Sequence, residues 1–123
     1  MDIKDTPVIS FITICYNGLA DTCALIESLY NVIHSVSYEI IVVDNASSQD
    51  EAAVIKSRYP WVTTIRSQQN SGFSGGNNLG IKAATGQYIF LINNDTYLME
   101  DGLPTLIARI ESQPEIGAVS PKI

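Results

Sequence analysis

Apolar runs and helical patterns alternate along most of this chain. Buried strands are predicted where apolar, often β-branched residues run almost without interruption: Val8–Cys15, Glu39–Asp44, Trp61–Ile65 and Tyr88–Ile92. Runs of this kind are typical of strands covered on both faces, and strands that alternate with helices predict a parallel sheet. The run at 88–92 is the most apolar, so we place it at the centre of the sheet.

The segments between the strands carry signals for helix starts. Asp21 is a predicted N-cap ahead of a helical apolar pattern, since its side chain can accept a hydrogen bond from a free backbone N–H. Ser48 and Glu51 have the spacing of a capping box, in which each satisfies the other's end of the helix. These signals predict helices after the first and second strands.

The second half of the chain continues the alternation. Asn70–Gly80 is predicted as a Gly/Asn-rich loop that runs into a helix at Ile81–Ala84, and Pro104 is predicted to start a last helix ending near Gln113. A further strand is expected from Ala118. The sequence therefore predicts an α/β, Rossmann-like domain over residues 1–123, with a mostly parallel sheet flanked by helices, that forms the first part of a larger fold.

Composition narrows the classes of function. The chain is 46% hydrophobic and 16% charged with a net charge of -6, which fits a globular protein and argues against nucleic-acid binding, because that relies on neutralising phosphates. Its two cysteines are expected to be buried free thiols. The polar start is unlike a secretory signal and no apolar run is long enough to span a bilayer, so we expect a cytoplasmic protein, with attachment to the inner face of the membrane through another segment left open.

Polar and aromatic residues follow the predicted strands at one edge of the sheet, where open α/β sheets bind ligands. Members of this set stand directly after apolar runs: Tyr16, Asn17, Asp44, Asn45, Asn93, Asn94 and Asp95. Each is also an ordinary residue of a turn or helix start. Their convergence on one edge is what predicts a binding site.

Three sets of residues in this region each have two possible roles, one in ligand binding and one in the structure alone. The Asp44 carboxylate only accepts hydrogen bonds, so it could accept one from the imide N–H of a uracil or thymine. Tyr16 either stacks on that base or is a half-buried aromatic residue at a strand end. The glycines at 72, 75, 76 and 80 match neither a P-loop nor a dinucleotide fingerprint, so they form a phosphate-facing loop or allow close helix–sheet packing. Asp95 either holds Mg²⁺ together with a diphosphate or belongs to an Asx turn without metal.

Taken in order, five stretches resemble glycosyltransferase family 2, whose members are inverting enzymes of the GT-A fold: ISFITICYNG, YEIIVVDNASSQD, NSGFSGGNNLGIKAATG, YIFLINNDTYL and IGAVSPKI. They span nearly the whole chain. The NSGFSGGNN stretch together with NNDT is most similar to the rhamnosyltransferase-like branch.

The resemblance implies a nucleoside-diphosphate sugar as the donor, with a UDP- or dTDP-sugar favoured and dTDP-rhamnose included. By position it assigns nucleoside contacts to Thr13, Tyr16 and Asp44, and contacts along the nucleotide and sugar to Asn70, Gly76 and Asn77. Asp95 matches the metal-binding acid of the family's Asp-x-Asp region, which implies Mg²⁺ or Mn²⁺ bound mainly with the diphosphate. Here that region reads Asn93-Asn94-Asp95, so an amide replaces its first acid.

The resemblance also implies parts that lie outside this chain. It places the general base and the surface for a glycan or lipid-linked acceptor beyond Ile123, so we expect the chain alone to have little transfer activity. Peripheral membrane association of the longer protein and self-association of this chain are further expectations. Two alternatives stay open: a nucleotide-sugar-binding module without catalysis, and a dinucleotide-dependent oxidoreductase, against which the first turn argues because it lacks a Gly-x-Gly-x-x-Gly motif.

Overall fold

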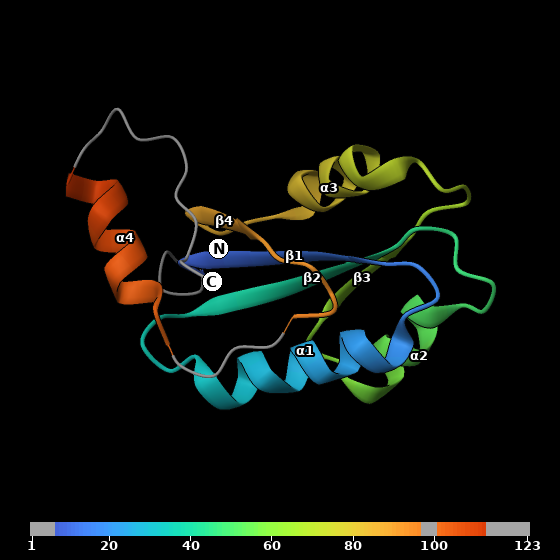
Figure 1. The fold of residues 1–123 in the computed structure, drawn as a ribbon, viewed down its shortest axis with the longest axis horizontal. Helices are drawn as coiled ribbons and strands as arrows, with labels where there is room; N and C mark the ends of the chain where they lie inside the picture. Colours follow the sequence, from blue (N-terminus) through green and yellow to red (C-terminus); the bar gives the residue numbers. More distant parts are fainter. Residues whose placement is uncertain (1–6, 97–100, 113–123) are drawn as a thin grey trace.

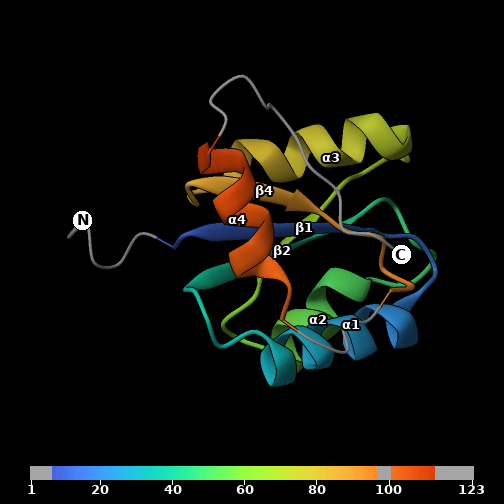
Figure 2. The same ribbon diagram turned by 60° about the vertical axis from the view of Figure 1, so that its left-hand side comes forward.

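The computed structural model describes residues 7–96 and 101–112. These residues form a four-stranded parallel sheet in the order β3-β2-β1-β4 with helices on both faces (Figures 1 and 2). In chain order the elements are β1 (Ile9–Cys15), α1 (Leu19–Val32), β2 (Tyr38–Asp44), α2 (Glu51–Arg58), β3 (Thr63–Arg66), α3 (Gly72–Ala83), β4 (Tyr88–Leu91) and α4 (Leu103–Ser112). The predicted α/β class and the parallel sheet are confirmed.

The strand register aligns the carboxyl ends of neighbouring strands. Cys15 pairs with Asp44, and Asp44 pairs with Arg66, so the last residues of β1, β2 and β3 stand in a row. We call this side of the sheet the carboxyl edge, and the side where the strands begin the amino edge. The next residues of each connection therefore converge on the carboxyl edge.

The two faces of the sheet are covered by different helices. In Figure 1, α1 and α2 lie on one face and α3 lies on the other. Phe11, Leu25 and Leu29 are fully buried on the α1 side, where each contributes about 1.5–3 kcal/mol through loss of water contact. Ile12 and Ile41 are fully buried beneath α3. Alternate side chains of β1 thus serve both faces, which explains its continuous apolar run.

Helix α3 begins earlier than the sequence predicts. Residues 72–80, predicted as a loop, form most of this helix, although glycine and asparagine favour helices poorly. A Cβ at Gly76 would lie 2.8 Å from Ile14 Cδ1, and a Cβ at Gly80 would collide with Ile12 Cγ2. The glycines therefore let the helix backbone approach β1 closely, and this packing outweighs the local propensity.

Three other local predictions are wrong. The strand at Tyr88–Leu91 lies beside β1 at the end of the described sheet and not at its centre. Helix α1 begins after Gly18, with Asp21 in its first turn, and helix α2 is capped by Asp50, whose Oδ1 accepts from Ala53 N at 3.0 Å. Glu51 does not complete a capping box, because it is the first residue of α2 and not the third; its carboxylate accepts from Gly18 N at 3.2 Å.

Helix α4 lies toward the amino edge of the sheet (Figure 2). Asp101 fixes its start, because Oδ1 accepts from Leu103 N at 3.1 Å while Oδ2 accepts from Ser35 N at 3.1 Å. The predicted strand from Ala118 lies outside the described residues. Within residues 7–96 and 101–112, no helix combines the length and apolar character required to cross a bilayer.

Candidate functional site

The strand order reverses between β1 and β4, and we call the carboxyl ends of these two strands, with the turns that follow them, the crevice between β1 and β4. The chain moves from β1 to β2 and β3 on one side, and then returns through α3 to β4 on the other side of β1. Open α/β sheets bind ligands at such a reversal, outside the carboxyl ends of the strands. The turn after β1 and the turn after β4 therefore border the candidate site.

These two turns are in contact. Asn94 Nδ2 donates to Thr22 Oγ1 at 3.2 Å, and a Cβ at Gly18 would come within 2.8 Å of Asn94 Nδ2. Tyr16 stands next to this contact at the end of β1 and is 55% exposed. Tyr16 and Asn94 therefore both lie at the carboxyl edge, with Tyr16 open to solvent, and their contacts with a ligand stay a prediction.

Asp95 lies in a tight turn beside the crevice. Thr96 N donates to Asn93 O at 3.1 Å, which closes a turn with Asn94 and Asp95 at its corner, and both Asn93 and Asp95 are exposed. This is a backbone turn, and it does not test the predicted Asx turn, which would be closed by the Asp95 side chain. An exposed carboxylate flanked by amides fits a hard cation that arrives with its own phosphate ligands.

Asp44 has a different environment. Its side chain has no exposed surface, Oδ1 accepts from Ser47 N at 3.0 Å, and Oδ2 accepts from Glu51 N at 3.0 Å. Arg66 Nη1 donates to the same Oδ2 at 2.6 Å, and Arg66 also donates to the carbonyl of Ser47 at 3.0 Å. The carboxylate that is predicted to bind a nucleobase is therefore engaged by the protein, so a base could reach it only after Arg66 moves.

The charge state of Asp44 follows from these contacts. Burial by itself raises the pKa of the carboxyl, but hydrogen bonds from Ser47 and Ala52 and the charge of Arg66 outweigh burial and hold the pKa below its usual value. Asp44 is therefore ionised at neutral pH, and its negative charge is spread over backbone N–H groups and a guanidinium.

Asn45 joins β2 to the start of α3. Its Nδ2 donates to Asn70 Oδ1 at 3.0 Å and to Gly72 O at 3.1 Å, and its Oδ1 accepts from Ser71 N at 3.1 Å. Gly72 has a φ of +76°, a left-handed conformation that glycine adopts without strain. Asn45 and Asn70, both predicted to contact the donor, bond to each other and hold the amino end of α3 at the carboxyl edge.

Asn17 links the turns after β1 and β2. It has a φ of 52°, its N–H donates to Ser47 Oγ at 2.9 Å, and its Oδ1 accepts from Ser48 N at 2.8 Å. Of the remaining predicted contacts, Thr13 is buried on β1 before its end, and its hydroxyl has no hydrogen-bond partner among the described residues. Gly76 packs on Ile14, and Asn77 is 7% exposed.

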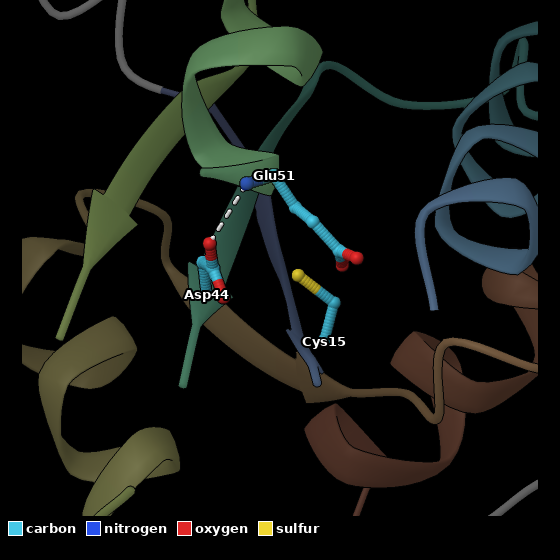
Figure 3. Close-up of side chains that lie close together, drawn as sticks. All are labelled: Cys15, Asp44 and Glu51. Carbon is cyan, nitrogen blue, oxygen red and sulfur yellow. Dashed lines mark hydrogen bonds between the residues drawn. The ribbon is translucent and has the colours of Figure 1, made fainter. Parts of the chain in front are cut away.

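A second polar cluster lies directly behind this edge. The ligand atoms of Cys15, Asp44 and Glu51 lie within 4.8 Å of one another, and all three residues are buried (Figure 3). Burial and the neighbouring Asp44 and Glu51 charges raise the pKa of the Cys15 thiol to about 12. A protonated thiol is a poor ligand for Mg²⁺ or Mn²⁺, and Asp44 already accepts hydrogen bonds on both oxygens, so this cluster does not fit those cations. Asp95 belongs to no such group of three among the described residues.

Sequence reasoning missed the residues that hold Asp44 in place. Arg66 and Ser47 were not singled out, and Glu51 was considered only as part of a capping box. Parallel pairing that aligns the ends of β2 and β3 would place Arg66 beside Asp44. Thr22, which the contact with Asn94 brings to the crevice, was not singled out either. The signal available in the sequence for these contacts was a charged residue at the last position of an apolar strand.

Solved structures with a similar fold support the architecture. Two structures of S. aureus TarS match with TM-scores of 0.70 and 0.72 at 22% and 20% identity, covering 85% and 93% of this chain and 19% and 38% of the matched chains. The fold is that of the GT-A glycosyltransferases.

Sequence relatives come from several bacteria. An uncharacterized glycosyltransferase of Haemophilus influenzae is 30% identical over 91% of this chain and 37% of its own length, and succinoglycan biosynthesis protein ExoO of Rhizobium meliloti is 30% identical over 89% and 32%. Poly-beta-1,6-N-acetyl-D-glucosamine synthase of Staphylococcus aureus is 29% identical over 98% and 29%. The chain spans about a third of the length of these curated relatives.

A family model also matches most of the chain. The model described as glycosyl transferase family 2 covers residues 10–121. This range includes all the described strands and helices, apart from Ile9 at the start of β1. The chain therefore belongs to glycosyl transferase family 2.

Proposed function

We propose that this chain supplies the donor-binding half of an inverting glycosyltransferase. The donor is a nucleoside-diphosphate sugar, either a UDP-sugar or a dTDP-sugar such as dTDP-rhamnose, and the acceptor is a glycan or a lipid-linked saccharide. The observation that carries the proposal is the crevice between β1 and β4, where the exposed Tyr16 and Asp95 stand at the strand ends in a chain of this family.

Each residue of the crevice has a role in this proposal. Tyr16 offers an aromatic face to the nucleobase, and Asn93 and Asn94 orient the diphosphate beside Asp95. The amino end of α3, held by Asn45 and Asn70, lies at the same edge, and the dipole of a helix favours an anion at that end. In this proposal, these neutral and backbone groups offset the repulsion between the diphosphate and a chain whose net charge is -6.

Asp95 fits a divalent cation, Mg²⁺ or Mn²⁺, that binds together with the donor. Bound there, the cation would offset the negative charge that develops on the leaving nucleoside diphosphate. Attack by an acceptor hydroxyl on the anomeric carbon requires a general base, which we assign to residues beyond Ile123. The predicted cytoplasmic location and the predicted self-association remain predictions.

Isothermal titration of the full chain with UDP, dTDP, GDP and NAD, each with and without Mn²⁺, tests the proposal. We expect a pyrimidine diphosphate to bind, Mn²⁺ to strengthen the binding, and Asp95→Asn to abolish that strengthening. Glu111→Gln is the matched control, since Glu111 is an exposed carboxylate on α4, near the opposite edge. Binding of NAD in place of the diphosphates would sink the proposal and favour an oxidoreductase.

A further inference from the structure

A groove lies on the α1 and α2 face, away from the carboxyl edge. It has a volume of about 320 Å³ and is lined by residues of α1 and of the segment that joins α2 to β3: Ile26, Glu27, Tyr30, Asn31, Tyr59 and Trp61. Tyr30 stands near the end of α1 and Trp61 just before the start of β3, so the groove opens near the amino edge. It shares no residue with the crevice between β1 and β4.

Aromatic rings form a continuous surface in this groove. The ring centroids of Tyr30 and Trp61 are 5.8 Å apart at 42°, and those of Tyr59 and Trp61 are 6.4 Å apart at 78°. Tyr30 is 63% exposed and Trp61 49% exposed, although large aromatic side chains are usually mostly buried. Trp61 thus packs against both tyrosines, and we call these three rings the aromatic platform of the groove.

Polar groups border the aromatic platform. Glu27 and Asn31 are separated by one helical turn on α1, so they face the same side. Burial, followed by a hydrogen bond to Glu27, raises the pKa of the Tyr59 hydroxyl to about 12, so this hydroxyl keeps its proton and donates. The groove thus combines acceptors and donors with exposed apolar rings.

The cations next to the groove are directed elsewhere. Lys56 Nζ donates to the carbonyls of Pro60 and Val62 at 2.8 and 3.0 Å, and Arg58 Nη1 donates to Cys23 Sγ at 3.5 Å. Among the described residues, the lining therefore offers a carboxylate without a matching cation, which disfavours an anionic ligand such as a nucleotide or a phosphorylated lipid. A neutral ligand with hydroxyl groups and a flat apolar face fits this lining best.

We propose that this groove binds a neutral saccharide chain. The apolar C–H face of a sugar ring stacks on Tyr30 and Trp61, while its hydroxyls exchange hydrogen bonds with Glu27 and Asn31. The site holds a glycan at a distance from the donor crevice and does not depend on nucleotide binding. If the groove binds no saccharide, the proposed function at the crevice is unaffected. If the crevice binds no nucleotide, the proposal for the groove is likewise unaffected.

The fluorescence of Trp61 provides a direct test, because it is the sole tryptophan of the chain. We would titrate the full chain with neutral linear hexasaccharides of β-1,4-linked N-acetylglucosamine, β-1,4-linked glucose and α-1,4-linked glucose, up to about 10 mM, and expect saturable binding of at least one. Tyr30→Ala should weaken binding about tenfold, because it removes one stacking ring, while Tyr30→Phe should retain it. Phe73→Ala is the matched control: Phe73 is also 63% exposed but lies on α3, on the other face.

Defined outcomes would overturn the proposal. These are no saturable change with any hexasaccharide, equal binding by wild type and Tyr30→Ala, or a change produced by choline but by no saccharide. A fluorescence change that depends on protein concentration without ligand would show that a second copy covers the groove. Far-ultraviolet circular dichroism of each variant checks folding, and if Tyr30→Ala fails to fold, Asn31→Ala, which leaves the rings in place, is expected to weaken binding in its stead.

Discussion

The two sides of the carboxyl edge use similar residues for different purposes. On the β2 side, Asp44 and Asn45 are buried, and their polar atoms are engaged by backbone N–H and C=O groups, Arg66 and Asn70. On the β4 side, Asn93 and Asp95 are exposed on a tight turn. The Asp-Asn pair at the end of β2 therefore holds the loops together, whereas the Asn-Asn-Asp run after β4 leaves Asn93 and Asp95 open to solvent.

This contrast distinguishes residues that hold the loops in position from residues that are available to bind a ligand. Burying a carboxylate is costly unless hydrogen bonds and an opposite charge compensate for it, and Asp44 has both. A residue in that state stabilises the fold and shapes the edge. Asp95 is exposed, so we expect it to contribute little to the fold and to be accessible to a ligand. Stability and binding measurements should therefore respond to different halves of the edge.

Replacing the buried carboxylate should have the largest effect. Asp44→Asn removes the charge that faces Arg66 and turns a donor toward other donors, so we expect the free energy of unfolding to fall by about 3 kcal/mol. Urea unfolding followed by circular dichroism measures it. A loss below about 1 kcal/mol would mean that the loops after β1 and β2 are held by other contacts.

The next largest effect is expected at Asn45. Asn45→Asp keeps the shape of the side chain but replaces its donor by an acceptor that faces Asn70 Oδ1 and the Gly72 carbonyl, which should cost about 2 kcal/mol. Hydrogen exchange should rise over residues 70–75. Asn78→Asp, at an exposed position of the same helix, is the control and should leave exchange there unchanged.

Low pH should reduce the stability that the β2 side of the carboxyl edge contributes to the fold. Because the pKa of Asp44 is lower in the folded chain than its unfolded value near ~3.9, its contribution to stability is present above about pH 4 and is lost as pH falls through the lowered pKa. Asp101, whose burial is likewise outweighed by hydrogen bonds that include one from Ser35, adds a contribution of the same sign. Stability measured between pH 2 and pH 5 should therefore fall less steeply in Asp44→Asn than in the wild type, and parallel curves would refute this.

The smallest change in stability is expected on the β4 side. Asp95→Asn should alter the free energy of unfolding by less than about 0.5 kcal/mol, because the side chain is exposed. The same variant should lose the Mn²⁺-dependent part of nucleotide binding. Destabilisation comparable to that of Asp44→Asn would erase the distinction between the two sides of the edge.

Strand positions could be predicted from the sequence, while the order of strands in the sheet was harder to infer. Continuous apolar runs identify β1 and β2 to within a residue, since a strand covered on both faces needs apolar residues at every position. The same reasoning placed β4 at the centre because of its apolar character. Within the described residues its Ile89 and Leu91 are half exposed, so apolar content alone did not reveal its neighbours.

The candidate site was predictable in its location and not in its internal contacts. The carboxyl ends of parallel strands must converge, and that places Tyr16, Asp44 and Asp95 at one edge. Which of them is buried depends on residues distant in sequence, such as Arg66. Likewise, only the packing of Gly76 and Gly80 on β1 explains why a segment with the composition of a loop becomes a helix.

Cys15 can serve as a chemical reporter for this edge. Its thiol is fully buried between Asp44 and Glu51, and with a pKa of about 12 it is almost entirely protonated at pH 8, so it should resist alkylation and oxidation in the folded chain. Labelling by iodoacetamide then requires the turns after β1 and β2 to open transiently, and the labelling rate becomes a measure of how often that happens. A ligand that bridges these turns would slow the modification of Cys15 without touching the sulfur.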